Sequence, residues 1–230
     1  MADNLERTRQ HFIAWTDYHE QVSSWFSELY QNAGTALSSR LRGRVLDVGN
    51  GGVFNYSLTN VDSLVTLDIA EGAWMESLPS NKIECRIGDA RDIPFEEGEF
   101  DRVVMQYLLH HLAERNLRET DQGVEKCLAE AYRVLKQSGK ILIVESCLPP
   151  VLERIENIGY GLLWYLVKFF DFPMVKQYSL PSLLQMVKGV GFREITAVEI
   201  NKGRYVSQLG IRTPAKLTPV KVHLVEGTKA

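Results

Sequence analysis

The stretch Val45–Phe54 reads VLDVGNGGVF, a short apolar run around one acid followed by a dense group of glycines. Glycines this close together suit a backbone that turns sharply after a strand and comes near a ligand. A dinucleotide-binding loop with Gly49 and Gly51 would also place glycine at position 54, where this chain has Phe54. The loop alone therefore leaves two interpretations open, a ligand-binding loop and a plain turn between a strand and a helix.

Short β-type runs alternate with helical or turn segments on both sides of this loop. The runs cover residues 44–48, 64–69, 82–87, 101–106 and 140–145. The segment 122–139 has helical spacing and is expected to stop at Gly139. Such alternation predicts an α/β fold, a Rossmann-like three-layer arrangement with a mostly parallel sheet covered on both faces. Two later β-type runs, 193–200 and 220–226, predict an antiparallel hairpin at the end of the sheet.

The N-terminal segment is expected to be helical, because its apolar residues recur at three- and four-residue steps until Gly34 interrupts them. These residues are Trp15, Tyr18, Val22, Trp25, Leu29 and Ala33. With 230 residues of which 45% are hydrophobic, the chain can bury one sizeable core. We expect a single domain over 1–230, with a helical N-terminal cap at 1–42 and a helical insertion at 148–178.

The amino-acid composition limits which kinds of molecule the protein is expected to bind. Lys and Arg number 26 against 29 Asp and Glu, a formal charge of -3, so no global positive field would attract nucleic acid or an anionic membrane. The three cysteines show no metal-type pairing and are expected to be buried thiols, with no metal site. The sequence shows neither a signal core nor an apolar run long enough for a membrane span, so we expect a cytoplasmic protein.

Polar and acidic residues follow the predicted strands at the edge where a sheet of this class binds ligands. They are Asp47, Gly49, Asn50 and Gly51 after the first run, Asp68 and Ile69 after the second, Asp89 and Ala90 after the third, and Gln106 and Tyr107 after the fourth. Acids at three successive strand ends would repel a phosphate, whereas they suit a ligand with hydroxyls, an amine and a positive charge. Asp68 lies 21 residues after Asp47, the spacing at which an acid meets a ribose in nucleoside-binding folds.

Four further stretches follow in a recognisable order. They are GDARDIPFEEGEFD (88–101), VVMQYLLHHL (103–112), EAYRVLKQSGKILIVE (130–145) and SLLQMVKGVGF (182–192). In this order the chain resembles the class I S-adenosylmethionine-dependent methyltransferases, in the broad group that includes the ubiquinone and menaquinone biosynthesis methyltransferases. It departs from the family where Val53 replaces a usual glycine and Asn50 replaces a usual cysteine or alanine. The polar NYSLTN (55–60) that follows predicts a brief or irregular first helix.

The resemblance implies that S-adenosylmethionine is the cofactor. It places the loop residues Asp47, Gly49 and Gly51, with Asn50 between them, at the methionine end. It places Asp68 at the ribose hydroxyls and Ile69 beside the adenine. It assigns Asp89 and the backbone of Ala90 to the adenine amine, and we include Gln106, at the fourth strand end, in the cofactor-binding set.

Methyl transfer needs few protein groups, because a sulfonium methyl is already activated. The enzyme has to align a nucleophile at roughly 3–3.5 Å and exclude water, and a base is needed only if the acceptor must lose a proton. His110 after the fourth run is the first candidate base, and His19 on the N-terminal helix is the second. The alternative for each is a histidine with a purely structural or solvated position.

The insertion after the fifth run carries clustered aromatic residues. They are Tyr160, Trp164, Tyr165, Phe169, Phe170 and Phe172. In the family, extra structure here usually covers the acceptor site, which implies a small, apolar or ring-bearing substrate. We expect the substrate pocket to involve Trp15, Tyr18, Tyr107, His111, Tyr160 and Trp164. Alternatively, the aromatic residues attach the insertion to the core or to a second subunit in a homodimer.

These observations lead to a function. MQYL (105–108) stands where amine methyltransferases acting on bases or glutamine carry N-P-P-Y or D-P-P-Y, which argues against a nucleic-acid acceptor. We expect S-adenosylmethionine-dependent methyl transfer to a small, apolar or aromatic metabolite. Two alternatives remain, a non-methylating cyclase or isomerase with the same fold and a non-catalytic binding subunit.

Overall fold

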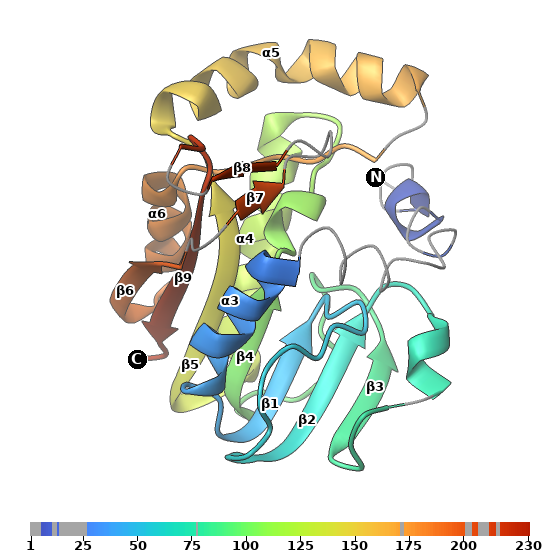
Figure 1. Ribbon diagram of the computed structural model, residues 1–230, viewed down its shortest axis with the longest axis vertical. Helices are drawn as coiled ribbons and strands as arrows, with labels where there is room; N and C mark the ends of the chain where they lie inside the picture. Colours follow the sequence, from blue (N-terminus) through green and yellow to red (C-terminus); the bar gives the residue numbers. More distant parts are fainter. Residues whose placement is uncertain are drawn as a thin grey trace.

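The computed structural model describes residues 6–10, 13, 27–76, 78–170, 173–200, 204–206, 212–214 and 217–230. Its centre is a seven-stranded sheet in the order β3-β2-β1-β4-β5-β9-β6 (Figure 1). The strands are β1 Gly43–Val48, β2 Val61–Asp68, β3 Ile83–Ile87, β4 Phe100–Gln106, β5 Leu135–Cys147, β6 Arg193–Glu199 and β9 Lys221–Thr228. β1 to β5 pair in parallel, and β9 runs antiparallel to both β5 and β6. The predicted α/β class and C-terminal hairpin are confirmed.

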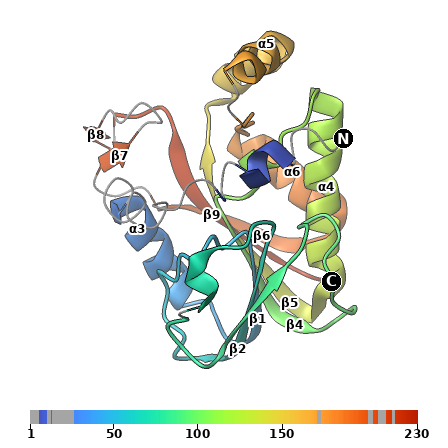
Figure 2. The same ribbon diagram turned by 90° about the vertical axis from the view of Figure 1, so that its right-hand side faces the viewer.

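The helices cover both faces of this sheet. Over residues 27–230 the described helices are α3 Ser27–Ser38, α4 Leu117–Val134, α5 Pro150–Phe169 and α6 Leu180–Val190, with short 3₁₀ turns η1 Ala73–Glu76 and η2 Leu109–His111; α5 lies beyond the strand ends and covers neither face. Figure 2 shows α3 on one side of the sheet and α4 and α6 on the other. A separate two-stranded sheet joins β7 Arg204–Val206 and β8 Arg212–Pro214. Within the described residues no helix is both long and apolar enough to cross a bilayer.

Two hydrophobic clusters form because alternate residues of each central strand point to opposite faces. On one face Val103 and Met105 pack with the apolar residues of α4 and α6. On the other face Val104, together with Val45, packs against the apolar stripe of α3. All three β4 residues are fully buried. Burial on both faces explains why the central strands read as nearly continuous apolar runs.

Between β1 and β2, residues 49–60 form no helix, which agrees with the predicted irregular connection. The loop instead lies against α3. The Nδ2 of Asn55 donates to the carbonyl oxygen of Tyr30 at 2.5 Å, and the amide of Ser57 donates to the Oγ of Ser38 at 2.9 Å. The expectation that Gly34 interrupts the N-terminal helix is wrong, since α3 continues through it. A Cβ at Gly34 would lie 1.9 Å from the carbonyl oxygen of Asn55, so this glycine makes room for the loop.

The helix predicted over 122–139 also ends earlier than expected, because α4 stops at Val134 and Gly139 does not terminate it. Leu135 already has extended dihedrals and pairs with the first residue of β4. The Nζ of Lys229 donates to the carbonyl oxygens of Arg133 and Leu135, at 3.1 and 2.8 Å. Pairing with the sheet and these hydrogen bonds satisfy carbonyls that a longer helix would have used.

The predicted helical insertion is confirmed by α5, which lies at the end of the molecule toward which β1 and β4 point (Figure 1). Whether the segment 148–178 acts as a lid stays a prediction. Of the N-terminal cap predicted over 1–42, α3 packs on the sheet. Residues 14–26 lie outside the described residues.

The close approach at Gly34 yields a matched pair of glycine variants. We expect Gly34→Ala to lower the free energy of unfolding by about 1–3 kcal/mol, because the added methyl group collides with the backbone of Asn55. Gly159→Ala in α5 should raise it by about 0.5–1 kcal/mol, since its Cβ would meet nothing within 4 Å and alanine favours helix. Urea unfolding of both variants measures the difference, and equal midpoints would contradict the close contact of α3 with the loop.

Candidate functional site

The loop after β1 begins at the carboxyl edge of the sheet. Gly49, Gly51 and Gly52 have φ angles of 71°, 57° and 80°, a region that side chains disfavour. A Cβ at Gly49 would lie 2.6 Å from the side chain of Leu108, at the start of η2. The loop therefore passes close to the segment after β4 and exposes backbone instead of side chains.

Asp47 at the end of β1 is fully buried. Its Oδ2 accepts hydrogen bonds from the Nδ2 of Asn50 at 2.7 Å and from the hydroxyl of Tyr56. Burial raises the pKa of the Asp47 carboxyl to about 7, against the lowering effect of these two hydrogen bonds. Its Oδ1 and the Oδ1 of Asn50 are buried acceptors that have no hydrogen-bond partner among the described residues. Tyr56 was missed in the sequence because it lies in the irregular NYSLTN segment.

Asp68 at the end of β2 holds the glycine loop in place. Its Oδ2 accepts the amide of Gly51 at 2.9 Å, and its Oδ1 accepts the amide of Ala70 at 3.0 Å. Burial raises the pKa of this carboxyl, and the backbone hydrogen bonds oppose that shift. The structure thus brings Asp47, Gly51 and Asp68 into one hydrogen-bonded group, as the strand-end pattern predicts. Ile69 is half-buried beside them.

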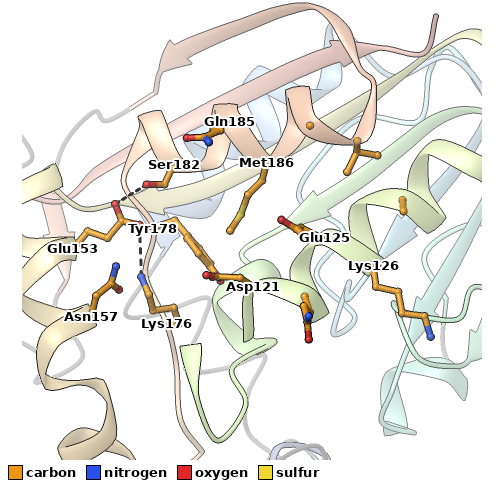
Figure 3. Close-up of a pocket in the computed structure, with 14 residues that line it drawn as sticks. Asp121, Glu125, Lys126, Glu153, Asn157, Lys176, Tyr178, Ser182, Gln185 and Met186 are labelled. Atoms are coloured by element: carbon orange, nitrogen blue, oxygen red, sulfur yellow. Dashed lines mark hydrogen bonds and ion pairs between the residues drawn. The ribbon is translucent and has the colours of Figure 1, made fainter. Parts of the chain in front are cut away.

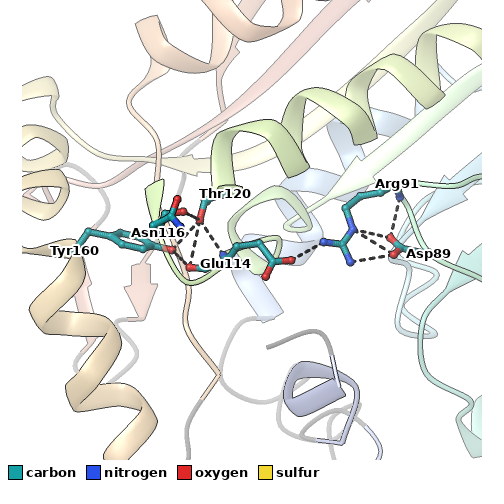
Figure 4. Close-up of polar contacts among 6 residues, drawn as sticks. All are labelled: Asp89, Arg91, Glu114, Asn116, Thr120 and Tyr160. Carbon is teal, nitrogen blue, oxygen red and sulfur yellow. Dashed lines mark hydrogen bonds and ion pairs between the residues drawn. The ribbon is translucent and has the colours of Figure 1, made fainter. Parts of the chain in front are cut away.

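Asp89 follows β3 and forms an ion pair with Arg91 that the sequence did not predict (Figure 4). The guanidinium of Arg91 contacts both carboxylate oxygens of Asp89, with Nη2 at 2.9 Å from Oδ2, and its Nη1 lies 2.6 Å from Oε1 of Glu114. Burial acts to raise the pKa of Asp89, but its hydrogen bonds and ion pair with Arg91 outweigh burial and lower it. Ala90 is buried in the adjoining core. The paired carboxylate stays charged and oriented at this strand end.

At the ends of β4 and β5 the structure joins a histidine to a buried acid. His110 Nδ1 lies 2.8 Å from Oε1 of Glu145, which is 1% exposed and also accepts the amide of Ser146. The other oxygen of Glu145 has no hydrogen-bond partner within the described residues. The rings of His110 and His111 lie 4.1 Å apart. Glu145 was missed although it ends the predicted strand 140–145, the fifth strand end of the sheet.

Two further predicted residues lie at the same strand end. Gln106 is 6% exposed, and its Oε1 accepts the Nδ2 of Asn55 at 3.0 Å, which ties the β1–β2 loop to β4. Tyr107 has a φ of 54°, unusual for a bulky residue, and its ring lies 5.1 Å from that of Tyr30 on α3. Backbone strain of this kind concentrates at functional sites.

The aromatic residues of α5 that were predicted to line the substrate pocket lie on its inner face. Tyr160 and Trp164 are buried and pack with Ala113 and Met174. The hydroxyl of Tyr160 donates to the carbonyl oxygen of Glu114 at 2.7 Å and lies 2.9 Å from the hydroxyl of Thr120 (Figure 4). In this packing they attach α5 to the start of α4, and their role in a pocket stays a prediction. The predicted residues Trp15, Tyr18 and His19 lie outside the described residues.

A groove of about 750 Å³ lies between α4, α5 and α6 (Figure 3). Within it the buried Lys176 lies 3.7 Å from Glu153 and 4.4 Å from the ring of Tyr178, whose hydroxyl donates to Asp121. The groove shares no lining residue with the strand-end site. It is a polar groove at the contact of α5 with α4 and α6.

Comparison with known proteins finds similar methyltransferases. A family model described as a methyltransferase domain matches residues 46–143. The demethylmenaquinone methyltransferase of Lactobacillus johnsonii is 26% identical over 160 residues, which cover 64% of this chain and 61% of that protein. The chain thus spans less than two thirds of the length of this relative.

Solved structures share the fold. The 1,6-didemethyltoxoflavin-N1-methyltransferase of Burkholderia thailandensis, with bound 1,6-didemethyltoxoflavin and S-adenosylhomocysteine, gives a TM-score of 0.68 at 14% identity, covering 98% of this chain and 88% of that one. The YcgJ protein of Bacillus subtilis gives a TM-score of 0.58 at 19% identity, covering 87% and 98%. At these identities the likeness concerns the fold alone.

The strand-end residues fit S-adenosylmethionine, the cofactor of this family. Within the described part of the chain, the buried Oδ1 atoms of Asp47 and Asn50 accept no hydrogen bond. A cationic amino group would supply the missing donor. Each carboxylate oxygen of Asp68 accepts one backbone amide and retains capacity for a hydroxyl. With this fold, this order of motifs and this set of acceptors, the chain resembles the class I S-adenosylmethionine-dependent methyltransferases, and residues 46–143 match the methyltransferase-domain model.

Proposed function

We propose that this protein transfers the methyl group of S-adenosylmethionine to a small-molecule acceptor, apolar or ring-bearing, bound beside the ends of β4 and β5. The observation that carries the proposal is the His110–Glu145 pair at this edge, next to the glycine loop that Asp47 and Asp68 hold. One sequence relative is named for demethylmenaquinone, and one solved structure of this fold is named for 1,6-didemethyltoxoflavin. The chain's charge of -3 also favours a neutral small molecule over a polyanion.

Each end of the cofactor has residues assigned to it. Asp47, Asn50 and the backbones of Gly49 and Gly51 would hold the methionine end, and Asp68 the ribose hydroxyls. Ile69, Asp89 and Ala90 would surround the adenine, with Arg91 fixing the Asp89 carboxylate. Gln106 would keep the β1–β2 loop closed through Asn55. When bound, the cofactor supplies an activated methyl group, so these residues need only bind and orient it.

His110 is suited to take a proton from the acceptor. A carboxylate oxygen only accepts, so the contact with Glu145 places the proton of the neutral imidazole on Nδ1 and leaves Nε2 as the basic atom. Glu145 also stabilises the imidazolium that forms after proton transfer. The acceptor would then be a hydroxyl or an acidic carbon. Tyr107 and His111, beside His110, are proposed to line its pocket.

Methyl transfer itself is tested with S-adenosylmethionine labelled in the methyl group and a small-molecule cell extract. We expect release of S-adenosylhomocysteine together with one compound that gains one methyl group by mass spectrometry. Turnover of an extract compound without S-adenosylhomocysteine would contradict the proposal and favour a cyclase.

Asp68 gives a test of cofactor binding. We expect Asp68→Ala to weaken S-adenosylhomocysteine binding by about 1.5–3 kcal/mol, because charge-assisted hydrogen bonds to hydroxyls are lost. Asp62→Ala, an exposed position in the same strand, is the control and should bind as the wild type does. Isothermal titration calorimetry measures both. No heat with the wild-type protein at millimolar ligand would refute the cofactor assignment.

The pKa of Asp47 gives cofactor binding a pH dependence. In the free protein this pKa is raised to about 7, so the carboxyl is largely protonated below that pH. A cationic amino group beside it lowers the pKa, so binding releases a proton below about pH 7 and affinity rises with pH up to that value. Calorimetry between roughly pH 5.5 and 7 should show several-fold tighter binding at the upper end. The variant Asp47→Asn should show a flat profile, and a flat wild-type profile would contradict the role of Asp47.

The role of His110 as the base is tested by measuring kcat and KM separately for each variant. His110→Gln should lower kcat by about 10²–10⁴, and Glu145→Gln should lower it less, because Glu145 acts through His110. His111→Gln is the matched comparison, expected to raise KM while kcat stays within about threefold. A loss of less than about threefold in kcat for His110→Gln would show that the acceptor needs no base from this residue.

A further inference from the structure

Helix α5 carries an uncovered apolar stripe. Val151, Ile155, Ile158, Leu162, Tyr165 and Phe169 recur at steps of three and four residues, so they share one face of the helix. Each of these side chains is between 60% and 88% exposed. We call these six residues the outer stripe. Burial of large apolar side chains is favourable, so six of them left in water on one helix mark a contact surface.

The opposite face of α5 packs against the rest of the protein. Glu153, Tyr160 and Trp164 are the buried residues of the helix, and they contact the rest of the protein. The Oε2 of Glu153 accepts the hydroxyl of Ser182 at 2.8 Å, and the Oε1 of Glu156 accepts the amide of Gln177 at 3.2 Å. Both acids of the helix therefore face the protein body, and the outer stripe is not needed to hold α5 in place.

The charges beside the outer stripe are both positive. Arg154 and Lys168 are the exposed charged residues of α5. An apolar helix face flanked by cations and ending in aromatic residues is the pattern of a helix that lies in the plane of an anionic lipid surface. Four charged residues along the helix make it unsuited to cross the hydrocarbon core.

The same charges disfavour a second copy of this chain as the occupant. In a symmetric antiparallel contact centred on Tyr160, the midpoint of the outer stripe, Arg154 of one copy would lie opposite the apolar Leu166 of the other. No exposed acid on α5 would pair with this arginine, and a cation buried against an apolar surface is costly. An anionic lipid headgroup complements Arg154.

We propose that the outer stripe of α5 docks the protein on an anionic lipid bilayer, with the helix lying along the headgroup region. The stripe runs about 27 Å along the helix, since each residue adds about 1.5 Å. Because the whole chain has a charge of -3, apolar burial supplies most of the affinity, and Arg154 selects for anionic lipid. α5 stands at the end of the molecule that holds the strand-end site, so docking would turn that end toward the bilayer (Figures 1 and 2).

The test is sedimentation of the full chain with vesicles of phosphatidylcholine, alone or with roughly one third phosphatidylglycerol. We expect the wild-type protein to bind both, with preference for the anionic vesicles. The triple variant I158Q/L162Q/F169Q should bind at least about tenfold more weakly. Ile87→Gln, at a 51% exposed position on β3, is the control and should bind as the wild type does. The variant R154Q should lose about threefold or more of the preference for anionic vesicles.

Several results would overturn the proposal. One is a wild-type protein that stays in the supernatant with both vesicles, and another is a triple variant that sediments as the wild type does. A dimer in light scattering that the triple variant converts to a monomer would assign the outer stripe to a second copy. A large drop in Tm of the triple variant would show that the stripe packs within the chain. Vesicle binding is measured without cofactor or acceptor, so it fails or succeeds independently of methyl transfer.

Discussion

The buried carboxyl group of Asp47 is the constraint on which the strand-end site depends. Since residues 49–60 form no helix, side chains have to fix the path from β1 to β2. Tyr56 and Asn50 reach back to Asp47 from two points of the loop, and Asp68 holds the amide of Gly51 between them. Burying a carboxyl group is costly unless it is hydrogen-bonded, so Asp47 and the loop stabilise each other.

The outer parts of the loop are fixed by packing against α3. Gly34 lets the backbone of Asn55 approach the helix, and the side chain of Asn55 bridges Tyr30 and Gln106. The hydrogen bond from Asn55 to Gln106 ties the loop to the end of β4. Tyr107 and the turn that carries His110 follow directly after this strand. The geometry of the proposed base and that of the cofactor loop are therefore linked by a short chain of hydrogen bonds.

Much of this arrangement could be predicted from the sequence. Alternating apolar runs identified the strands, because a sheet buried on both faces requires such runs, and the acids at the strand ends identified the site edge. The end of α4 could not be foreseen, because Lys229, almost 100 residues later, supplies the hydrogen bonds that satisfy its last carbonyls. The role of Gly34 could not be foreseen either. A glycine at this position suggests the end of a helix until the loop that packs on it is known. Arg91 and Tyr56 likewise act through contacts that residue spacing does not encode, whereas Glu145 was open to prediction at a fifth strand end.

The missing helix after β1 has an electrostatic consequence. A helix that began at this loop would direct its positive N-terminal dipole at the bound cofactor. Here the field at the loop comes mainly from two carboxyl groups, Asp47 and Asp68, so it favours positive charge. S-adenosylmethionine carries a sulfonium charge that S-adenosylhomocysteine lacks. Negative charge at this edge would therefore favour the charged cofactor over its uncharged product.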